Sequence, residues 1–158
     1  NLNNMQGFYN LSDKIRETLQ LDQYVNTVTY GNLFEIDLNK STIFPLSHFM
    51  VTNAVLQESV WSFSISVLCM DIVEENKNFA NGIPGEFRGN NNEQDVFNTQ
   101  LAVGNRLIEL LRRGSLYVEL YQLQGDATFE PFVDRFENKL AGWTISFNVE
   151  IPNGMTIC

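Results

Sequence analysis

The sequence predicts a single α+β domain in which an antiparallel or mixed β-sheet packs against two main α-helices. Residues 8–21 and 92–113 place apolar side chains at the spacing of one helix face. Residues 61–69 and 143–151 alternate apolar and polar side chains, as a strand with one buried face does. The length of 158 residues fits one domain, so we treat 1–158 as a unit.

Composition and charge limit the function classes. Hydrophobic residues make up 44% of the chain, which is ordinary for a globular protein. No stretch approaches the roughly 18 apolar residues of a membrane span, and the start lacks the order of a signal peptide. We therefore expect a soluble protein of intracellular origin. With 19 acidic and 10 basic residues the net charge is −9, which argues against a general nucleic-acid binder.

The first predicted helix, residues 8–21, is followed by a predicted strand over residues 26–38. Asn10 or Ser12 is expected to cap the start of the helix. The apolar face of the helix is formed by Leu11, Ile15 and Leu19. The apolar face of the strand is formed by Phe34, Ile36 and Leu38, opposite Glu35 and Asp37.

Residues 39–49 contain Pro45, which disfavours a central strand and predicts an edge strand or an extended loop. The only histidine of the chain, His48, lies in this segment. Catalysis by a histidine needs a nucleophile or carboxylate partner, and the sequence shows none for it. We interpret His48 as a surface or structural residue.

Residues 58–73 form the clearest predicted strand. Ser62, Ser64 and Ser66 share its polar face, which we expect to look toward solvent or a partner. These serines lack the sharp G-x-S-x-G turn that presents one kind of catalytic serine. Beyond Leu68 both faces are apolar, so we expect a helix or a neighbouring subunit to cover that end of the strand.

Residues 74–94 break the pattern with three glycines, one proline and six asparagines. A loop of this length is usually functional or mobile, so it can be a partner-gripping arm, an active-site lid or disorder. Phe79, Ile83 and Phe87 are spaced as anchor points of an arm. We favour the arm and plain disorder equally.

The second helix, residues 92–113, has Asn92 as its expected N-cap. Its apolar stripe is formed by Val96, Phe97, Leu101, Val103, Gly104, Leu107, Ile108 and Leu111. Gly104 within this stripe predicts a close approach to the sheet. Gly114 is expected to end the helix in a left-handed conformation.

Arg112 and Arg113 form the only basic pair of the chain. Their place at the end of a helix suits the helix dipole better than a phosphate site. The two arginines and the three anchors of the predicted arm are also our candidate subunit-interface residues: Phe79, Ile83, Phe87, Arg112 and Arg113.

The C-terminal part predicts a strand over 116–123, a turn at 125–126 and an interrupted crossover over 127–142. The final strand, 143–151, alternates perfectly, and residues 153–158 read as a C-terminal tail.

The final strand resembles the 61–69 strand in its alternation, so the two are expected to pair. Each then contributes a tryptophan, Trp61 and Trp143, to the side that the helices cover.

The sequence predicts no catalytic, metal or cofactor site. Cys69 and Cys158 are interpreted as two unrelated thiols, since a disulfide between them ties a core strand to a tail. One histidine and two distant cysteines do not supply the paired ligands of a zinc site. The sequence therefore predicts a protein that acts through the shape of its surface rather than by catalysing a reaction.

The segment PFVDRFENKLAGW feeding TISFNVEIP resembles the C-terminal pattern of the tail-terminator and neck-ring proteins of tailed bacteriophages. The order of predicted elements is similar over most of the chain, while the sequence pattern is specific only over 127–152. The asparagine-rich, acidic style resembles crAss-like phages of gut Bacteroidetes. The resemblance implies a tail-terminator-like α+β fold and no enzymatic activity.

The resemblance also implies partners and a location. The chain is expected to form a hexameric or dodecameric cyclic ring and to contact neighbouring portal, neck or tail proteins. Phage DNA passes through the channel without specific binding, and no membrane is involved. The expected location is the virion, after assembly in the cytoplasm of the host bacterium. The ring's copy number and the channel-lining face stay open.

Two rival functions stay open from the residues alone. One is a small metal-dependent hydrolase that uses Asp71, Glu74 and Glu119. The other is a monomeric adaptor or ligand-binding module that uses the 74–94 segment as a clamp. Tight binding of a divalent metal favours the hydrolase, and a deep pocket in a monomer favours the adaptor.

Overall fold

The computed structural model describes residues 7–31, 43–73, 93–135 and 139–152. In chain order the elements are α1 (Gly7–Leu21), β1 (Thr27–Tyr30), β2 (Leu46–Gln57), β3 (Val60–Ile72), α2 (Glu93–Arg113), α3 (Ser115–Val118), β4 (Gln122–Arg135) and β5 (Lys139–Pro152). The five strands form one sheet in the order β1-β2-β3-β5-β4.

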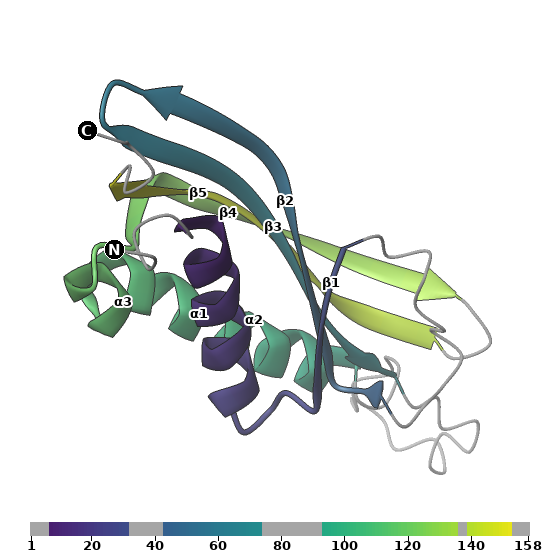
Figure 1. Ribbon diagram of the computed structural model, residues 1–158. Coiled ribbons are helices and arrows are strands. Elements are labelled where there is room, and N and C mark those ends of the chain that lie inside the picture. Colours follow the sequence, from purple (N-terminus) through teal and green to yellow (C-terminus); the bar gives the residue numbers. More distant parts are fainter. Residues whose placement is uncertain (1–6, 32–42, 74–92, 136–138, 153–158) are drawn as a thin grey trace, which may run out of the picture.

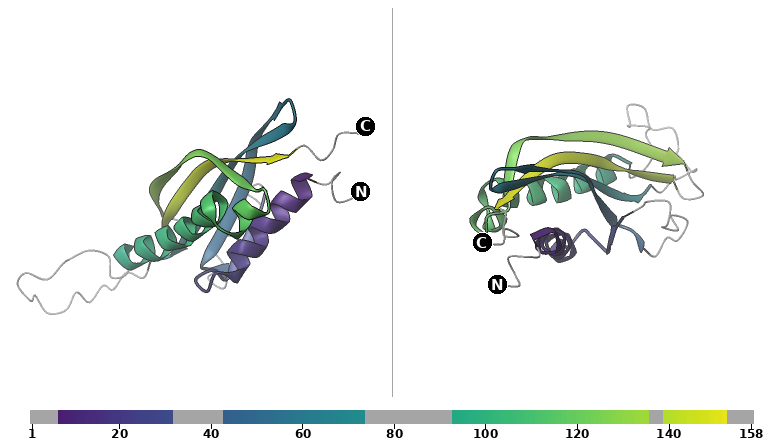
Figure 2. Two further views of the ribbon diagram at one scale, coloured as in Figure 1. Left: turned by 90° about the vertical axis from the view of Figure 1, so that its left-hand side faces the viewer. Right: turned by 45° about the horizontal axis from the view of Figure 1, so that its top comes forward.

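The sheet is mixed, and its two long helices lie on the same face. β1 runs parallel to β2, while every other neighbouring pair is antiparallel. Figure 1 shows α1 and α2 side by side under the curved sheet, and Figure 2 shows the opposite face of the sheet without a helix. The predicted α+β class is therefore confirmed.

The centre of the sheet is the antiparallel pair of β3 and β5, as the sequence predicted. Its register sets Phe63 opposite Val149, Ile65 opposite Phe147, and Val67 opposite Ile145. These residues are buried on the helix-covered face. Trp143 also faces the helices, because its Nε1 donates a hydrogen bond of 2.8 Å to the carbonyl oxygen of Phe97 in α2.

The main core lies between this pair and the helices. The predicted stripe of α1 is confirmed, since Leu11, Ile15 and Leu19 are each only 1% exposed. In α2 the stripe is largely as predicted, but Gln100 is buried in it and Leu101 is 37% exposed. Burying each large aliphatic side chain contributes about 1.5–3 kcal/mol, so these two helices supply much of the stability.

A second apolar cluster covers the other face of the sheet at one end. Phe44, Leu46, Met70 and Leu140 are buried there, and Leu68 and Phe132 pack against them. The predicted two-sided cover of β3 beyond Leu68 is therefore confirmed. On this face the cover includes Phe44 from the segment before β2 and Phe132 from β4.

Two C-terminal predictions were wrong. Residues 116–123 were expected to be a strand, but Ser115–Val118 form α3 and the strand begins at Gln122. Residues 127–142 were expected to be a crossover, but β4 continues to Arg135 and pairs with β5 through a hairpin. Pro131 interrupts the sequence pattern, yet it is tolerated because β4 is the last strand of the sheet.

The expected turn at Gly125 is a bulge within β4. The pairing register shifts between Gln124 and Thr128, and Gly125 has a φ of +69° there. A glycine adopts this left-handed conformation without the steric cost that a Cβ brings. The sequence therefore predicted correctly that Gly125 marks an irregular backbone position. It was wrong that this position is a turn between two elements.

Two expected caps were also wrong. α1 begins at Gly7, so Asn10 and Ser12 lie inside the helix rather than at its cap. Gly114 has a φ of −103°, which is not left-handed. A Cβ at Gly114 would lie 2.7 Å from the Cα of Leu110, so lack of space explains this glycine better than backbone conformation.

Several predictions concern residues outside the described ranges. β1 covers only Thr27–Tyr30 of the strand expected over 26–38, and Phe34, Ile36 and Leu38 lie outside the description. The arm with Phe79, Ile83 and Phe87, the N-cap Asn92 and the tail 153–158 lie outside it as well.

The predicted close approach at Gly104 is confirmed. A Cβ at this position would lie 2.3 Å from Cδ1 of Ile145 and 2.9 Å from Cε2 of Phe129. Ile145 is fully buried in β5 and therefore has little room to move. The glycine lets α2 lie directly on β5.

We predict that Gly104→Ala destabilises the protein by about 1–2 kcal/mol, measured by urea unfolding. Overpacking a core costs about 1–3 kcal/mol, while alanine regains up to about 1 kcal/mol of helix propensity over glycine. Ile145→Val removes the Cδ1 atom that the new methyl group meets, so the double variant should lose less stability than the sum of the two single variants. Strict additivity would contradict the proposed contact.

Candidate functional site

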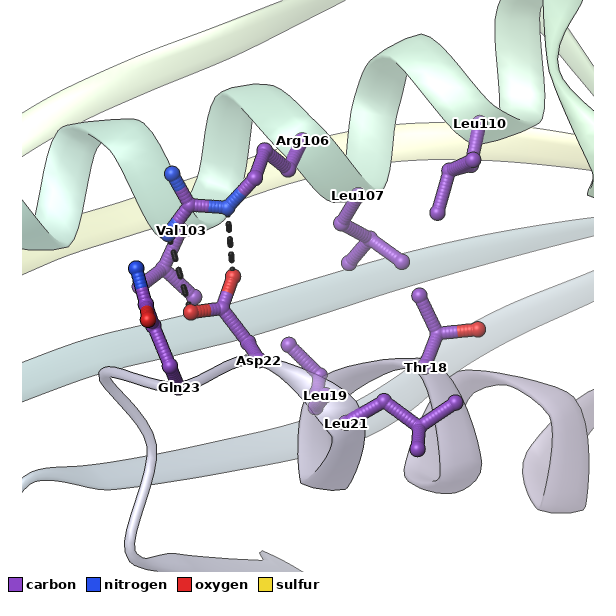
Figure 3. A pocket seen from close by; sticks show the side chains of 9 residues that line it. All are labelled: Thr18, Leu19, Leu21, Asp22, Gln23, Val103, Arg106, Leu107 and Leu110. Atoms are coloured by element: carbon purple, nitrogen blue, oxygen red, sulfur yellow. Dashed lines mark hydrogen bonds and ion pairs between the residues drawn. The ribbon is translucent and has the colours of Figure 1, made fainter.

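The helix-covered side of the molecule contains a groove between α1 and α2. It has a volume of about 420 Å³ and is lined by Thr18, Leu19, Leu21, Asp22, Gln23, Val103, Arg106, Leu107 and Leu110. Figure 3 shows the leucines lying along its length and the Asp22–Arg106 pair at one end. Leu21 is 86% exposed at the rim and Leu110 is half-buried, whereas Leu19 and Leu107 are buried.

Asp22 and Arg106 close this groove with a two-point ion pair. Arg106 donates from Nε to Oδ2 at 2.7 Å and from Nη2 to Oδ1 at 2.9 Å. The guanidinium also lies 5.5 Å from the centre of the Tyr24 ring, within the range of a cation–π contact. The hydrogen bonds to Asp22 raise the pKa of the Arg106 guanidinium. Arg106 therefore links α2 to Asp22 at the end of α1.

A second ion pair holds the other part of α1. Lys14 Nζ lies 3.0 Å from Oε2 of Glu119, just beyond α3. The hydrogen bond to Glu119 and its negative charge raise the pKa of the Lys14 ammonium group. Both groups are substantially exposed, so this pair contributes little to stability and mainly sets the orientation of α1.

The opposite face of the sheet presents hydroxyl and amide groups. Ser64 Oγ donates to Oδ1 of Asn148 at 2.7 Å, and Ser62 Oγ donates to Oε1 of Gln124 at 3.1 Å. An open hollow of about 430 Å³ on this face is lined by Thr52, Ser64, Ile65, Ser66, Asp126, Thr128, Ser146, Phe147 and Asn148. Ser62 and Ser64 of β3 therefore form cross-strand hydrogen bonds, and the hollow contains one acidic and no basic residue.

His48 is a structural residue, as interpreted from the sequence. It is fully buried, and Nε2 lies 2.7 Å from the carbonyl oxygen of Gly31. Because a carbonyl only accepts, Nε2 is the donor, and in the neutral ring Nδ1 accepts from the Thr29 hydroxyl at 2.8 Å. Both ring nitrogens thus join β1 to β2. Burial lowers the pKa of His48.

Arg112 and Arg113 lie in the last turn of α2, where positive charge is favourable. Both are exposed, and Nε of Arg113 lies 2.6 Å from Oε2 of Glu109 one turn earlier. Their role at a subunit interface stays a prediction. The other interface candidates, Phe79, Ile83 and Phe87, lie outside the described residues.

Of the carboxylates named for a metal-dependent hydrolase, Asp71 and Glu119 lie at opposite ends of the sheet and are not brought together. Asp71 lies in β3 opposite Ala141, near the start of β5. Glu119 lies just before β4, and the first residue of β4 pairs with Glu150 at the other end of β5. Glu119 forms an ion pair with Lys14. Glu74 lies outside the description. Within the four described ranges no group of three His, Cys, Asp or Glu side chains is arranged to hold a metal ion.

Cys69 lies in the core rather than in a reactive site. It is fully buried in β3, and the Ser47 hydroxyl donates to its sulfur at 3.8 Å. Burial raises the pKa of the Cys69 thiol to about 12, so the nucleophilic thiolate is scarce at neutral pH.

Exposed apolar side chains gather around α3. Tyr117 and Val118 lie in this short helix and Leu120 follows it, and their exposed fractions are 42%, 76% and 52%. Leu120 has a φ of +74°, an uncommon conformation for a residue with a Cβ. We call these three residues the α3 patch.

Sequence reasoning missed the two features that dominate this surface. Asp22 and Arg106 are 84 residues apart, so no local spacing connects them. The α3 patch was hidden because LYVELYQL reads as an alternating strand. The only sequence signal for Asp22 was that an acidic residue directly follows a predicted helix.

Comparisons with known proteins add no assignment. No protein-family model matches the sequence, and no curated protein matches it. Among the described helices, none combines the length and apolar character needed to cross a membrane.

We predict that Arg106→Ala destabilises the protein more than Asp22→Ala. The side chain of Asp22 is only 7% exposed, so removing its partner leaves a carboxylate that is poorly hydrated, whereas Arg106 is 46% exposed. We expect losses of about 2–3 and 1–2 kcal/mol, measured by urea unfolding. Arg113→Ala is the control, because its pair is exposed and should change stability by no more than about 0.5 kcal/mol. Equal losses for all three variants would contradict this account.

We also predict that stability falls as the pH is lowered below about 6.5. The pKa of His48 is lowered in the folded protein, so the unfolded chain binds the proton first. The stability that neutral His48 contributes is therefore complete above the pKa that this histidine has in the unfolded chain. It is lost as the pH falls toward the lower pKa of His48 in the folded protein. Urea unfolding of the parent and of His48→Gln at several pH values measures this. A parent and variant with the same pH dependence between 7.5 and 5.5 (chosen to bracket the histidine range of about 6.5) would show that His48 is not the cause.

Proposed function

We propose that this chain is a structural virion protein that forms a ring at the neck or tail-tube end of a tailed bacteriophage. The observation that carries the proposal is the presence of two unlike apolar surfaces on one subunit. One is the α3 patch of Tyr117, Val118 and Leu120, and the other is the groove between α1 and α2. A closed ring needs such a pair, because head-to-tail contacts join two different surfaces.

The polar face of the sheet suits a channel wall. Its hydroxyl and amide groups bond to one another across the strands, as Ser64 does with Asn148. The hollow on this face contains Asp126 and no lysine or arginine. DNA is held chiefly through basic contacts to phosphates, so a face of this kind lets DNA pass without specific binding.

The helix layer suits a rigid subunit. α1 is joined to α2 by the Asp22–Arg106 pair and to the end of α3 by the Lys14–Glu119 pair. The groove and the α3 patch thereby keep fixed positions, as repeated contacts around a ring require. Neighbouring portal, neck or tail proteins are the partners that this proposal implies.

The test is assembly with interface variants. Electron microscopy and native mass spectrometry of the concentrated protein should show closed rings of six or twelve chains. Val118→Glu changes the α3 patch and Leu21→Glu changes the rim of the groove, and each variant alone should form no closed ring. Both side chains are largely exposed, so neither change should unfold the subunit.

The mixture of the two variants is the decisive control. Each variant retains the surface that the other has lost, so an equimolar mixture should form one head-to-tail contact between unlike variants that neither variant forms alone. A parent protein that stays monomeric, alone and with candidate neck proteins, would overturn the proposal. Rings that persist in both variants would overturn the assignment of these surfaces.

A monomeric binding module is the second candidate, and the same groove favours it. Its apolar lining and volume of about 420 Å³ fit part of a partner helix or a small ligand. A stable monomer in which Leu21→Glu abolishes capture of a ligand, while Val118→Glu does not, would favour this module over the ring.

A further inference from the structure

Among the described residues, β2 has no strand partner on its outer edge over most of its length. β1 covers only Leu46–Phe49, and the backbone N–H of Gly31 makes the last contact, 3.3 Å from the carbonyl oxygen of Phe49. Beyond this point, from Met50 to Gln57, no described strand pairs with the outer side of β2. Figure 1 shows this part of β2 extending with β3 away from the helices. An exposed row of backbone donors and acceptors is a template for another strand.

This edge has one feature that hinders strand addition, a bulge between Val51 and Asn53, but it lacks charged residues and proline. Residues 50–57 contain no charged residue and no proline. The other edge of the sheet, β4, contains a bulge at Gly125, the charged residue Glu130 and Pro131, all of which hinder pairing. The contrast indicates that β2 rather than β4 is the edge that accepts a partner strand.

We infer that β2 pairs antiparallel with β2 of a second copy of this chain, about a two-fold axis at Val55. In this register Val55 lies opposite its own symmetry mate, Ala54 opposite Leu56, and Asn53 opposite Gln57. Each pair joins side chains of the same kind, apolar with apolar and amide with amide. Cross-strand pairs of this sort stabilise antiparallel strands.

The faces of the strand agree with this register. Ala54 and Leu56 pair within the sheet with Phe63 and Trp61, which lie on the helix-covered face. Val55 pairs with Ser62 on the polar face. A two-fold axis perpendicular to the sheet keeps each face continuous, so Ala54 meets Leu56 on one side and Val55 meets Val55 on the other. The bulge between Val51 and Asn53 limits the pairing to Asn53–Gln57.

Burial and charge favour a second copy as the occupant. Val55 and Leu56 are 45% and 52% exposed, and the pairing covers both. The chain has a net charge of −9, so two copies repel each other over much of their surface. Residues 53–57 are an uncharged place where they can meet, and Glu58 at the end of the strand has Thr52 rather than another acid opposite it.

This contact does not rest on the proposed ring. A head-to-tail ring joins unlike surfaces, whereas the β2 contact joins like surfaces and yields a closed pair. The pair can exist as a dimer of free subunits or between two rings.

Cysteine cross-linking tests the register directly. In a Cys158→Ser background, Val55→Cys places two thiols directly opposite each other, where Cβ atoms are about 4.5–5.5 Å apart, near the range that a disulfide spans. Mild oxidation should convert most of the protein into a covalent dimer. Gln57→Cys is the control, because its two copies lie about 13 Å apart along the strands and should not cross-link. No dimer with Val55→Cys, or equal cross-linking of both variants, overturns the inference.

A charge at the axis tests the contact without cross-linking. Val55→Glu sets two carboxylates against each other, so sedimentation should show loss of the dimer that the parent forms at high concentration. Val133→Glu is a matched control, because this valine of β4 is 43% exposed and receives the same charge. It should dimerise like the parent. A parent that never dimerises, or a dimer unaffected by Val55→Glu, overturns the inference.

Discussion

The contact of α2 with the β3–β5 pair is the interaction on which the rest of the structure depends. Gly104 allows the helix to lie directly on Ile145, and Trp143 bonds to the helix backbone through Phe97. The central strands place their alternating apolar residues against this helix, and α1 completes the same layer. One side of the sheet carries both long helices. The other side carries the apolar cluster around Met70 at one end and hydroxyl and amide groups, such as those of Ser64 and Asn148, elsewhere. The division into a helix side and a polar side follows from this one packing contact.

Ion pairs and buried polar contacts then set the finer geometry. Asp22 and Arg106 hold α1 at a distance from α2 that leaves an apolar groove between them. His48 holds the short β1 to only the first part of β2, through Thr29 and the carbonyl of Gly31. Beyond Phe49, no strand among the described residues pairs with the outer edge of β2. The groove considered for assembly thus depends on a polar contact that sets how closely α1 packs against α2.

The two assembly contacts differ in symmetry, and this difference makes them separable. The α3 patch and the groove are unlike surfaces and can join only head to tail, whereas residues 53–57 of β2 are complementary to themselves. A virion ring subunit needs the first type, and an edge strand free of charge permits the second. The acidic character of the whole chain makes the placement of such uncharged regions important, since elsewhere copies repel each other.

The sequence by itself determined the elements whose patterns are long and regular. The stripe of Leu11, Ile15 and Leu19, the alternation of β3 and β5, and the close approach at Gly104 were all predictable, because side-chain periodicity reports directly on a buried face. Tertiary structure decided the rest. Pro131 breaks the pattern of β4, yet the position of this strand at the edge of the sheet permits it. The Asp22–Arg106 pair and the open edge of β2 depend on which distant segments meet, and local spacing carries no information about that.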